Sequence, residues 1–145
     1  MKNYIFSLVI FTVFLSLNLE ARDDKYLFPI DHTLTKHSAL VNPNIKLYFA
    51  TQPPEEVIRD NLGTYKSSKT TNARLKPPRE SCDWVFISAV KGLQSRASKL
   101  GGNAVINIHS YYEEIKMLDE NLYECHDGKN ISRVVLRGTV VKLEE

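Results

Sequence analysis

The sequence lacks the short motifs by which many enzymes are recognised. It holds no phosphate-binding loop of the form G-x-x-x-x-G-K-[ST], no G-x-S-x-G, no H-E-x-x-H and no C-x-x-C. A large excess of one charge is also missing, because 19 basic and 17 acidic residues leave a formal net charge of +2. The 145 residues are too few for a kinase or a TIM barrel. We therefore expect one small domain that is not an enzyme, carries no cofactor and binds no nucleic acid.

Long apolar runs are absent except at the N-terminus. There Lys2 precedes an apolar run over residues 4–17, and the small residue Ala21 follows shortly afterwards. This arrangement is typical of a secretory signal peptide, and the run is shorter than the roughly 20 apolar residues of a membrane anchor. We predict that residues 1–21 are a signal peptide and that the mature protein is periplasmic or secreted and not embedded in the membrane.

Cysteine is scarce, and its two copies, Cys82 and Cys125, both lie in the part expected to be exported. In an oxidising compartment an even pair of cysteines most simply forms a disulfide. Such a bridge closes a loop of about 44 residues and contributes about 4 kcal/mol in the chain-entropy model. The alternative is a reactive thiolate at Cys82, where the dipole of an expected helix favours the charged form. We favour the structural bridge.

The pattern of apolar residues predicts one α+β domain over residues 45–145. Before it, residues 22–44 are polar and interrupted by prolines, which predicts an irregular N-terminal arm. A short helical turn is predicted over residues 55–60, and a bulge or bend at Gly138. The expected order is β-β-α-β-β-β, with one main helix packed on a mostly antiparallel sheet as a two-layer sandwich. The strands are expected over residues 45–51, 64–67, 103–112, 122–125 and 132–143.

The main helix is predicted from Ser81, as its N-cap, to Leu100, where Gly101 and Gly102 stop it. An apolar stripe recurs at spacings of three and four residues and consists of Cys82, Phe86, Ala89, Leu93, Ala97 and Leu100. The strand that follows alternates between two faces. We expect Ala104, Ile106, Ile108 and Ser110 on its apolar face, and Val105, Asn107, His109 and Tyr111 on a mixed polar and aromatic face.

Two segments are candidate binding surfaces. Residues 66–79 hold five basic side chains and no acidic one, which predicts either a mobile, solvated loop or a patch for anionic partners. The contact residues of such a patch would be Lys66, Lys69 and Lys76. The second candidate is a polar and aromatic surface, which is either covered by the N-terminal arm or free to bind a peptide, a glycan or a partner subunit. Its members are Asn107, His109, Tyr111, Tyr112 and Tyr123.

His109 and His126 are weak candidates for metal ligands. They lie on different expected strands, with Glu124 and Asp127 near the second histidine in the sequence. Two isolated histidines are more often ordinary polar positions, so we predict no metal. The alternative to the main functional prediction is a small metal-binding protein or hydrolase that uses His109 and His126.

The run L-Q-S-R-A-S-K-L-G-G-N-A-V-I-N-I-H-S-Y-Y over residues 93–112, with Cys82 before it and Y-E-C over residues 123–125 after it, carries a resemblance. It resembles a family of small exported bacterial proteins that often carry the label "excinuclease ATPase subunit". It is more distantly similar to the YbjQ-like domains, which are named for heavy-metal binding, and to the outer-membrane sensor of the Rcs system. The resemblance implies an α+β domain, an envelope location and a bridge between Cys82 and Cys125, with ring oligomers among the YbjQ-like relatives. The label itself does not fit, because an ATPase subunit needs phosphate-binding loops.

Together these observations predict a non-enzymatic exported protein of the cell envelope that binds a partner or acts as a sensing module. The expected partner is an envelope or extracellular protein, and assembly with further copies of the same chain is left open.

Overall fold

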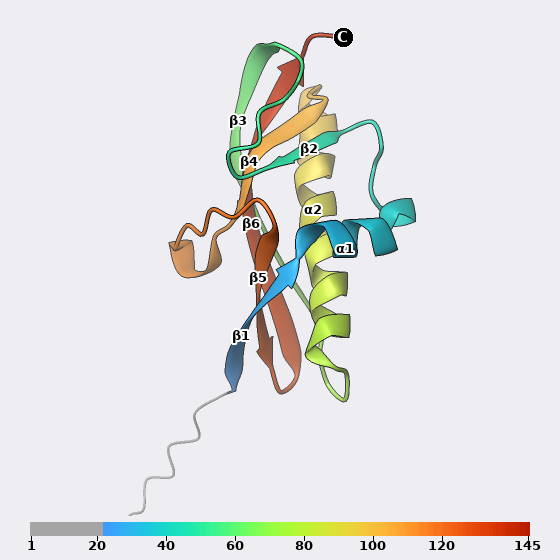
Figure 1. Ribbon diagram of the computed structural model, residues 1–145, viewed down its shortest axis with the longest axis vertical. Coiled ribbons are helices and arrows are strands. Elements are labelled where there is room, and N and C mark those ends of the chain that lie inside the picture. Colours follow the sequence, from blue (N-terminus) through green and yellow to red (C-terminus); the bar gives the residue numbers. More distant parts are fainter. Residues whose placement is uncertain (1–21) are drawn as a thin grey trace, which may run out of the picture.

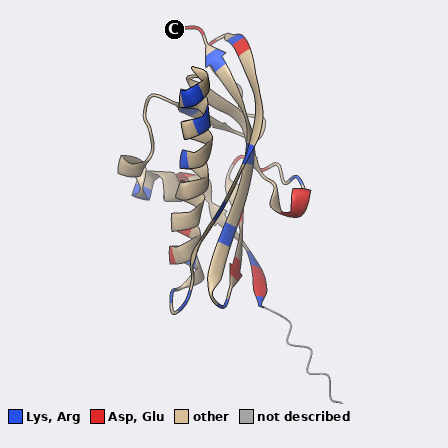
Figure 2. Cartoon of the chain, turned by 180° about the vertical axis from the view of Figure 1, so that it is seen from behind, with Lys and Arg blue, Asp and Glu red and all other residues tan. Residues whose placement is uncertain are grey.

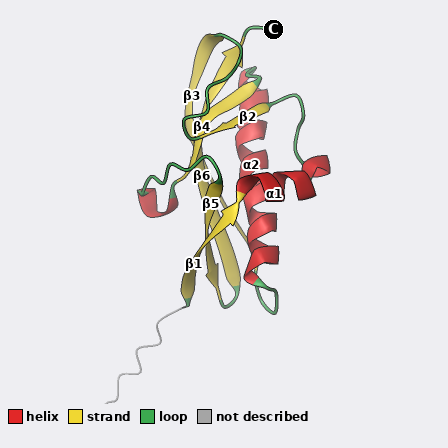
Figure 3. Ribbon diagram, in the orientation of Figure 1, coloured by secondary structure: helices red, strands yellow, loops and turns green. Residues whose placement is uncertain are grey.

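The computed structural model describes residues 22–145, and the predicted signal peptide lies outside this range (Figure 1). Over the described range, the structure contains no helix with the length and apolar character that a membrane crossing requires. Two α-helices and six strands follow one another in the described part, with a short 3-10 helix after α1 and another after β4 (Figure 3). The elements are β1 (Asp23–Pro29), α1 (Ile30–Lys36), η1 (Ser38–Leu40), β2 (Lys46–Phe49), β3 (Ile58–Asn72), α2 (Pro78–Leu100), β4 (Ala104–Ser110), η2 (Tyr112–Glu114), β5 (Leu122–Gly128) and β6 (Ile131–Leu143).

The sheet is organised around β6. One edge of β6 pairs with β3 over nearly its whole length, from the pair Ile58 and Leu143 to the pair Asn72 and Ile131. The other edge pairs first with β5 and then with β4, and β1 and β2 extend the sheet outward from these two strands. Among these pairs only β2 with β4 is parallel. The long helix α2 covers one face, so the predicted α+β fold with one main helix on a mostly antiparallel sheet is confirmed (Figure 1).

The core forms where the apolar stripe of α2 meets the sheet. Cys82, Phe86, Ala89, Leu93 and Ala97 are each at most 1% exposed, as the helical spacing predicts. Leu100, the last member of the predicted stripe, is instead 40% exposed at the end of the helix. Gly101 ends the helix with φ 77°, a left-handed conformation that glycine adopts without steric cost.

The predicted N-cap at Ser81 is wrong, because α2 begins earlier, at Pro78. Proline is well suited to the first position of a helix, since its missing N–H has no partner there in any case. Ser81 consequently lies within the first turns, and its side chain is buried.

The predicted irregular arm over residues 22–44 is wrong as well. Its first part is β1, which pairs antiparallel with all of β5, from Asp23 and Gly128 to Pro29 and Leu122. The next part is α1, which buries Ile30 and Thr33. The strand partner is about a hundred residues away, so no local pattern indicates it.

β3 also differs from its prediction. It is 15 residues long and contains the strand expected over residues 64–67. It also takes the place of the second half of the helical turn expected over residues 55–60 and of the start of the loop expected over residues 66–79. Most of its side chains are exposed, because β3 lies at an edge of the sheet. Its sequence therefore carries few of the apolar residues by which a strand is recognised.

A β-bulge redirects β4. Ile106 pairs with Thr139 and His109 pairs with Arg137, so two residues of β4 lie opposite Gly138. Asn107, one of the two, has φ 53°. The extra residue reverses the alternation of faces, and both Val105 and Ile108 pack in the core beneath α2. The prediction that Ile108 shares a face with Ala104 and Ile106 is therefore wrong. The bulge predicted at Gly138 lies instead on the neighbouring strand β4, directly opposite this glycine.

Candidate functional site

Consecutive residues at the start of α2 are linked to alternate residues of β5. The alternate residues of a strand share one face, so this part of β5 presents a row of side chains to the helix. The links are a hydrogen bond from Ser81 to Asp127, the disulfide from Cys82 to Cys125 and a hydrogen bond to Asp83 from Tyr123. They hold the start of α2 to the sheet.

The disulfide between Cys82 and Cys125 is present as predicted. The two Cα atoms are 5.9 Å apart, and both residues are fully buried. No free cysteine occurs in residues 22–145, so the alternative of a reactive thiolate at Cys82 finds no support. The bridge joins the first turns of α2 to the middle of β5.

Asp83 is the most enclosed carboxylate next to this bridge, with 1% of its surface exposed. Burial raises the pKa of Asp83, but hydrogen bonds from the Thr33 and Tyr123 hydroxyls and the charge of Arg79 outweigh this effect and lower the pKa. The donors are the Thr33 Oγ1 at 2.9 Å, the Tyr123 hydroxyl at 3.0 Å and the Arg79 Nε at 2.9 Å. The contacts from Thr33 and Tyr123 are buried and the one from Arg79 is partly buried, so they indicate a structural role for this carboxylate.

Tyr123 was predicted at the polar and aromatic surface, and this prediction is wrong. Its side chain is 1% exposed and its ring stacks on Phe86 with a centroid distance of 4.0 Å. Burial, followed by the nearby Asp83 carboxylate, raises the pKa of the Tyr123 hydroxyl and keeps it protonated as a donor. The reason is the strand alternation, which places Tyr123 on the same face of β5 as Cys125.

A second buried polar cluster flanks the disulfide on its other side. The Ser132 Oγ lies 2.8 Å from the Ser81 Oγ and also within hydrogen-bond distance of the Asp127 carboxylate. Both serines are 0% exposed and Asp127 is 3% exposed. Asp127 also lies 3.5 Å from the guanidinium of Arg22. A nucleophilic serine needs access to substrate, which these enclosed hydroxyls do not have.

The opposite face of the sheet carries a separate cluster around His126. The ring of Tyr112 stacks on the imidazole with a centroid distance of 3.4 Å, and the Tyr112 hydroxyl donates to Asp23 at 3.0 Å. The His126 Nε2 lies 2.5 Å from Glu124, and its Nδ1 lies 3.3 Å from Asp23. Burial and then the hydrogen bond to Asp23 raise the pKa of Tyr112. This cluster joins β1, β5 and η2 on the face that α2 does not cover.

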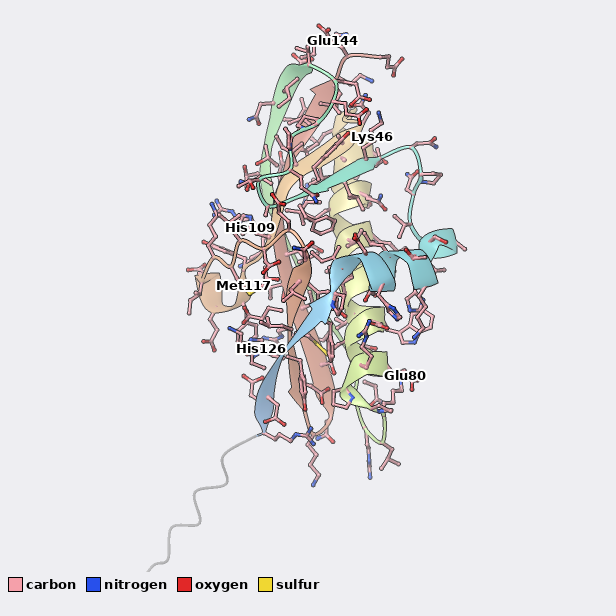
Figure 4. All side chains as sticks on the ribbon, in the orientation of Figure 1. Lys46, Glu80, His109, Met117, His126 and Glu144 are labelled. Carbon is pink, nitrogen blue, oxygen red and sulfur yellow. A yellow bond between two sulfur atoms is a disulfide. The ribbon has the colours of Figure 1, made fainter. Side chains whose placement is uncertain are left out.

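His109 lies in different surroundings from His126 (Figure 4). Its Nδ1 is 2.7 Å from the carbonyl oxygen of Asn107, and its ring meets the edge of Tyr111. Burial lowers the pKa of His109 and outweighs the opposing hydrogen bond to Asn107, and the charges of Lys116 and Arg137 act in the same direction as burial. Over residues 22–145 no group of three or more His, Cys, Asp or Glu side chains is placed to hold a metal ion. Asn107, Tyr111 and Tyr112 are partly exposed, whereas His109 is 4% exposed, so the prediction that His109 contributes to a binding surface is wrong. The two histidines are not joined in one site.

The side of the molecule between β3 and α2 carries a groove of about 620 Å³, here called the basic groove. Its charged residues are all cations, namely Lys69, Lys91, Arg96 and Lys99. Within residues 22–145 none of these four side chains forms an ion pair with a carboxylate. Figure 2 shows Lys and Arg along the exposed side of α2 and on the strands beside it. The groove is lined by Lys69 and Thr70 of β3 and by Ser88, Lys91, Gly92, Ser95, Arg96 and Lys99 of α2.

Gly92 allows β3 to approach the helix closely at the base of the groove. A Cβ atom at this position would lie 2.3 Å from the Ser67 Oγ and 3.3 Å from the Lys69 Cε. Arg96 stays at the side of the groove because its guanidinium lies 5.0 Å from the centre of the Tyr65 ring. The position of the cations is therefore set by packing between the helix and the edge strand.

Comparisons with protein-family models, with curated proteins and with solved structures found no match in any of the three.

The basic surface predicted over residues 66–79 is divided by the structure. Lys69 lines the basic groove, whereas Lys66 points to the opposite side of β3 and lines a smaller cavity with Arg133 and Tyr111. Lys76 lies exposed in the loop between β3 and α2. The division follows from strand alternation, because residues three apart in a strand face opposite sides. The helix cations Lys91, Arg96 and Lys99 were missed, although residues 84–112 contain no acidic residue and so hinted at this surface.

Proposed function

We propose that the protein is a non-enzymatic, exported binding module of the cell envelope that recognises an anionic partner in the basic groove. The observation that carries this proposal is the convergence of four cations, unpaired in the described residues, on one groove without a carboxylate among its lining residues. Like charges gathered at one place repel one another, and an anion that enters the groove relieves this repulsion. A groove of one charge also steers oppositely charged partners toward itself.

Export is supported by two independent features. The N-terminal residues have the composition of a signal peptide. The buried disulfide between Cys82 and Cys125 is of the kind that persists in an oxidising compartment. A binding role rather than catalysis is supported by the carboxylates nearest the helix start, because Asp83 and Asp127 are enclosed and engaged by protein donors.

Charge reversal in the groove tests the proposal. Two labelled probes, a short peptide of alternating Glu and Thr and inorganic polyphosphate, are titrated with the purified mature protein, and binding is followed by fluorescence anisotropy. Lys91→Glu combined with Lys99→Glu should weaken binding of at least one probe by about tenfold or more, because two attractive charges become repulsive.

The matched control is Lys116→Glu combined with Lys129→Glu, which changes the net charge by the same amount outside the groove. At physiological salt, where distant charges are screened, this control should bind the probes within about twofold of the native affinity. Equal losses in both double variants would contradict a specific site, and so would a failure of both probes to bind the native protein at low salt.

A further inference from the structure

This inference rests on the proposed function and names the partner. We propose that the anion is an extended acidic segment of another polypeptide, which adds as a strand to the free edge of β3 and places its carboxylates in the basic groove.

The first argument is the free edge of β3. β3 pairs with β6 on one side only, and no strand of residues 22–145 lies on its other side. An unpaired strand edge presents a row of N–H and C=O groups that another extended chain can join. A phosphate ion or a lipid headgroup can accept hydrogen bonds from single N–H groups, but it cannot pair with a whole row of alternating N–H and C=O groups. The edge therefore favours a polypeptide among anionic partners.

The second argument is the regularity of β3 beside the groove. The register with β6 is unbroken from Thr64 to Asn72, and the irregular pairings are confined to the part before Thr64. No proline interrupts β3. Lys69 and Thr70, which line the groove, lie within the regular part. An added strand can thus follow the same length of β3 that borders the groove.

The third argument is the shape of the helix wall. α2 and β3 run along the long axis of the molecule, and the small residues Ser88, Gly92 and Ser95 line the groove from the helix side (Figures 1 and 2). They leave room for a chain beside β3. Lys91 and Lys99 are eight residues apart, which corresponds to about 12 Å along the helix axis. In an extended chain, two side chains on the same face four residues apart are separated by about 13 Å.

This match predicts the spacing of the acidic residues in the partner. Carboxylates at alternate positions of the added strand point to one side of the sheet. The outer two of three such carboxylates can then meet Lys91 and Lys99, while the middle one lies nearer Arg96. Lys69 lies beside Gly92 and adds a second cation at the Lys91 end. The expected pattern is therefore [DE]-x-[DE]-x-[DE].

Charge also argues against a second copy of β3 as the occupant. β3 carries Lys66 and Lys69 in its regular part and no acidic residue there. Two copies joined edge to edge would bring these lysines near one another, and like charges on neighbouring strands destabilise the pairing. An acidic strand gains from the same lysines. The edge is thus protected against pairing with itself while it stays open to an acidic chain.

The test compares two peptides of equal charge. One alternates Glu and Thr, and the other has the same side chains with every backbone nitrogen methylated, which keeps every carboxylate but removes every backbone donor. The first peptide should bind about tenfold or more tightly than the second, because several backbone hydrogen bonds are lost. In hydrogen exchange, the first peptide should protect the amides of residues 64–72, and the variant with Lys91→Glu and Lys99→Glu should lose this protection.

The other outcomes separate this inference from the proposed function. If both peptides bind within about twofold of each other, recognition is electrostatic alone; the strand model is then wrong and the anion groove stands. If polyphosphate binds through Lys91 and Lys99 and neither peptide binds, the partner is a phosphate-rich ligand and the inference is overturned. If no probe binds, the proposed function fails together with it.

Discussion

Reduction of the disulfide should lower the free energy of unfolding by about 4 kcal/mol without unfolding the protein. Cys82 and Cys125 are 43 residues apart in the sequence, so the bridge closes a long loop. In the chain-entropy model a loop of about 44 residues restricts the unfolded chain by about 13 cal/mol/K, which is about 4 kcal/mol at 25 °C. This is a large share of the roughly 5–15 kcal/mol by which a small domain is stable.

The native state should survive reduction because other contacts hold the same elements together. Asp83 and Tyr123 lie on one side of the bridge, and Ser81 and Asp127 lie on the other. The cysteine sites are fully buried among apolar residues, where thiols pack as small hydrophobic groups. The far-UV circular dichroism of the reduced protein in buffer should therefore match that of the oxidised protein.

The measurement is a pair of urea titrations, with and without dithiothreitol, followed by circular dichroism and by the fluorescence of Trp84, the single tryptophan. With m values of about 1.5–2 kcal/mol/M, the midpoint of the reduced protein should fall by about 2–3 M. The m value should rise, because the unfolded chain without the bridge is more expanded. The variant Cys82→Ala Cys125→Ala should lose at least as much, since it also leaves cavities.

Two results would refute this reasoning. A midpoint shift below about 0.5 M would show that restriction of the unfolded chain is not what the bridge contributes. Loss of the circular dichroism signal on reduction in buffer would show that the hydrogen bonds beside the bridge do not hold α2 to β5.

Further predictions concern the buried carboxylate and the bulge. Asp83→Asn should cost about 2–4 kcal/mol in urea titrations at pH 7, because charge-assisted hydrogen bonds from buried donors are lost. The pKa of Asp83 is lower in the folded than in the unfolded protein, so the ionised carboxylate stabilises the fold at pH values above the unfolded pKa. This contribution is lost as the pH falls toward the folded pKa. The difference between native and Asp83→Asn stability should therefore shrink below about pH 4, and a constant difference from pH 7 to pH 3 would contradict the assigned shift. Gly138→Ala should cost about 1–3 kcal/mol, because the new Cβ would lie 2.7 Å from the Val105 Cγ1. Gly101→Ala has open space around it and meets only the backbone cost of φ 77°, so a loss at Gly101 larger than at Gly138 would argue against the steric explanation.

Local patterns predicted the parts of the fold that depend on neighbouring residues. The stripe from Cys82 to Ala97 and the stop at Gly101 follow from helical periodicity and from the conformational freedom of glycine. β1 and the full length of β3 could not be predicted in this way. β1 is held by a distant strand, and β3 is an exposed edge whose side chains show little alternation between apolar and polar residues.

One site error was avoidable, whereas another was not. Tyr123 is two residues from Cys125, so the predicted disulfide already implied that Tyr123 faces the helix. The basic groove combines Lys69 with residues of α2 that lie 19 to 30 positions later, and the alignment of β3 with the helix decides which lysines meet. That alignment depends on Gly92 and Ser67, whose close approach has no signature in the sequence.

The central place of β6 has a consequence for how the chain acquires its shape during synthesis. β3, β4 and β5 all pair with β6, which follows all three of them in the chain. Until that strand has emerged, β3 has no strand to pair with, and β4 is not joined to the β1–β5 pair through the sheet. The six-stranded sheet can therefore form only after β6 has been synthesised. Removal of the last few residues that include Val141 and Leu143 should for the same reason disturb the whole sheet and not only its end.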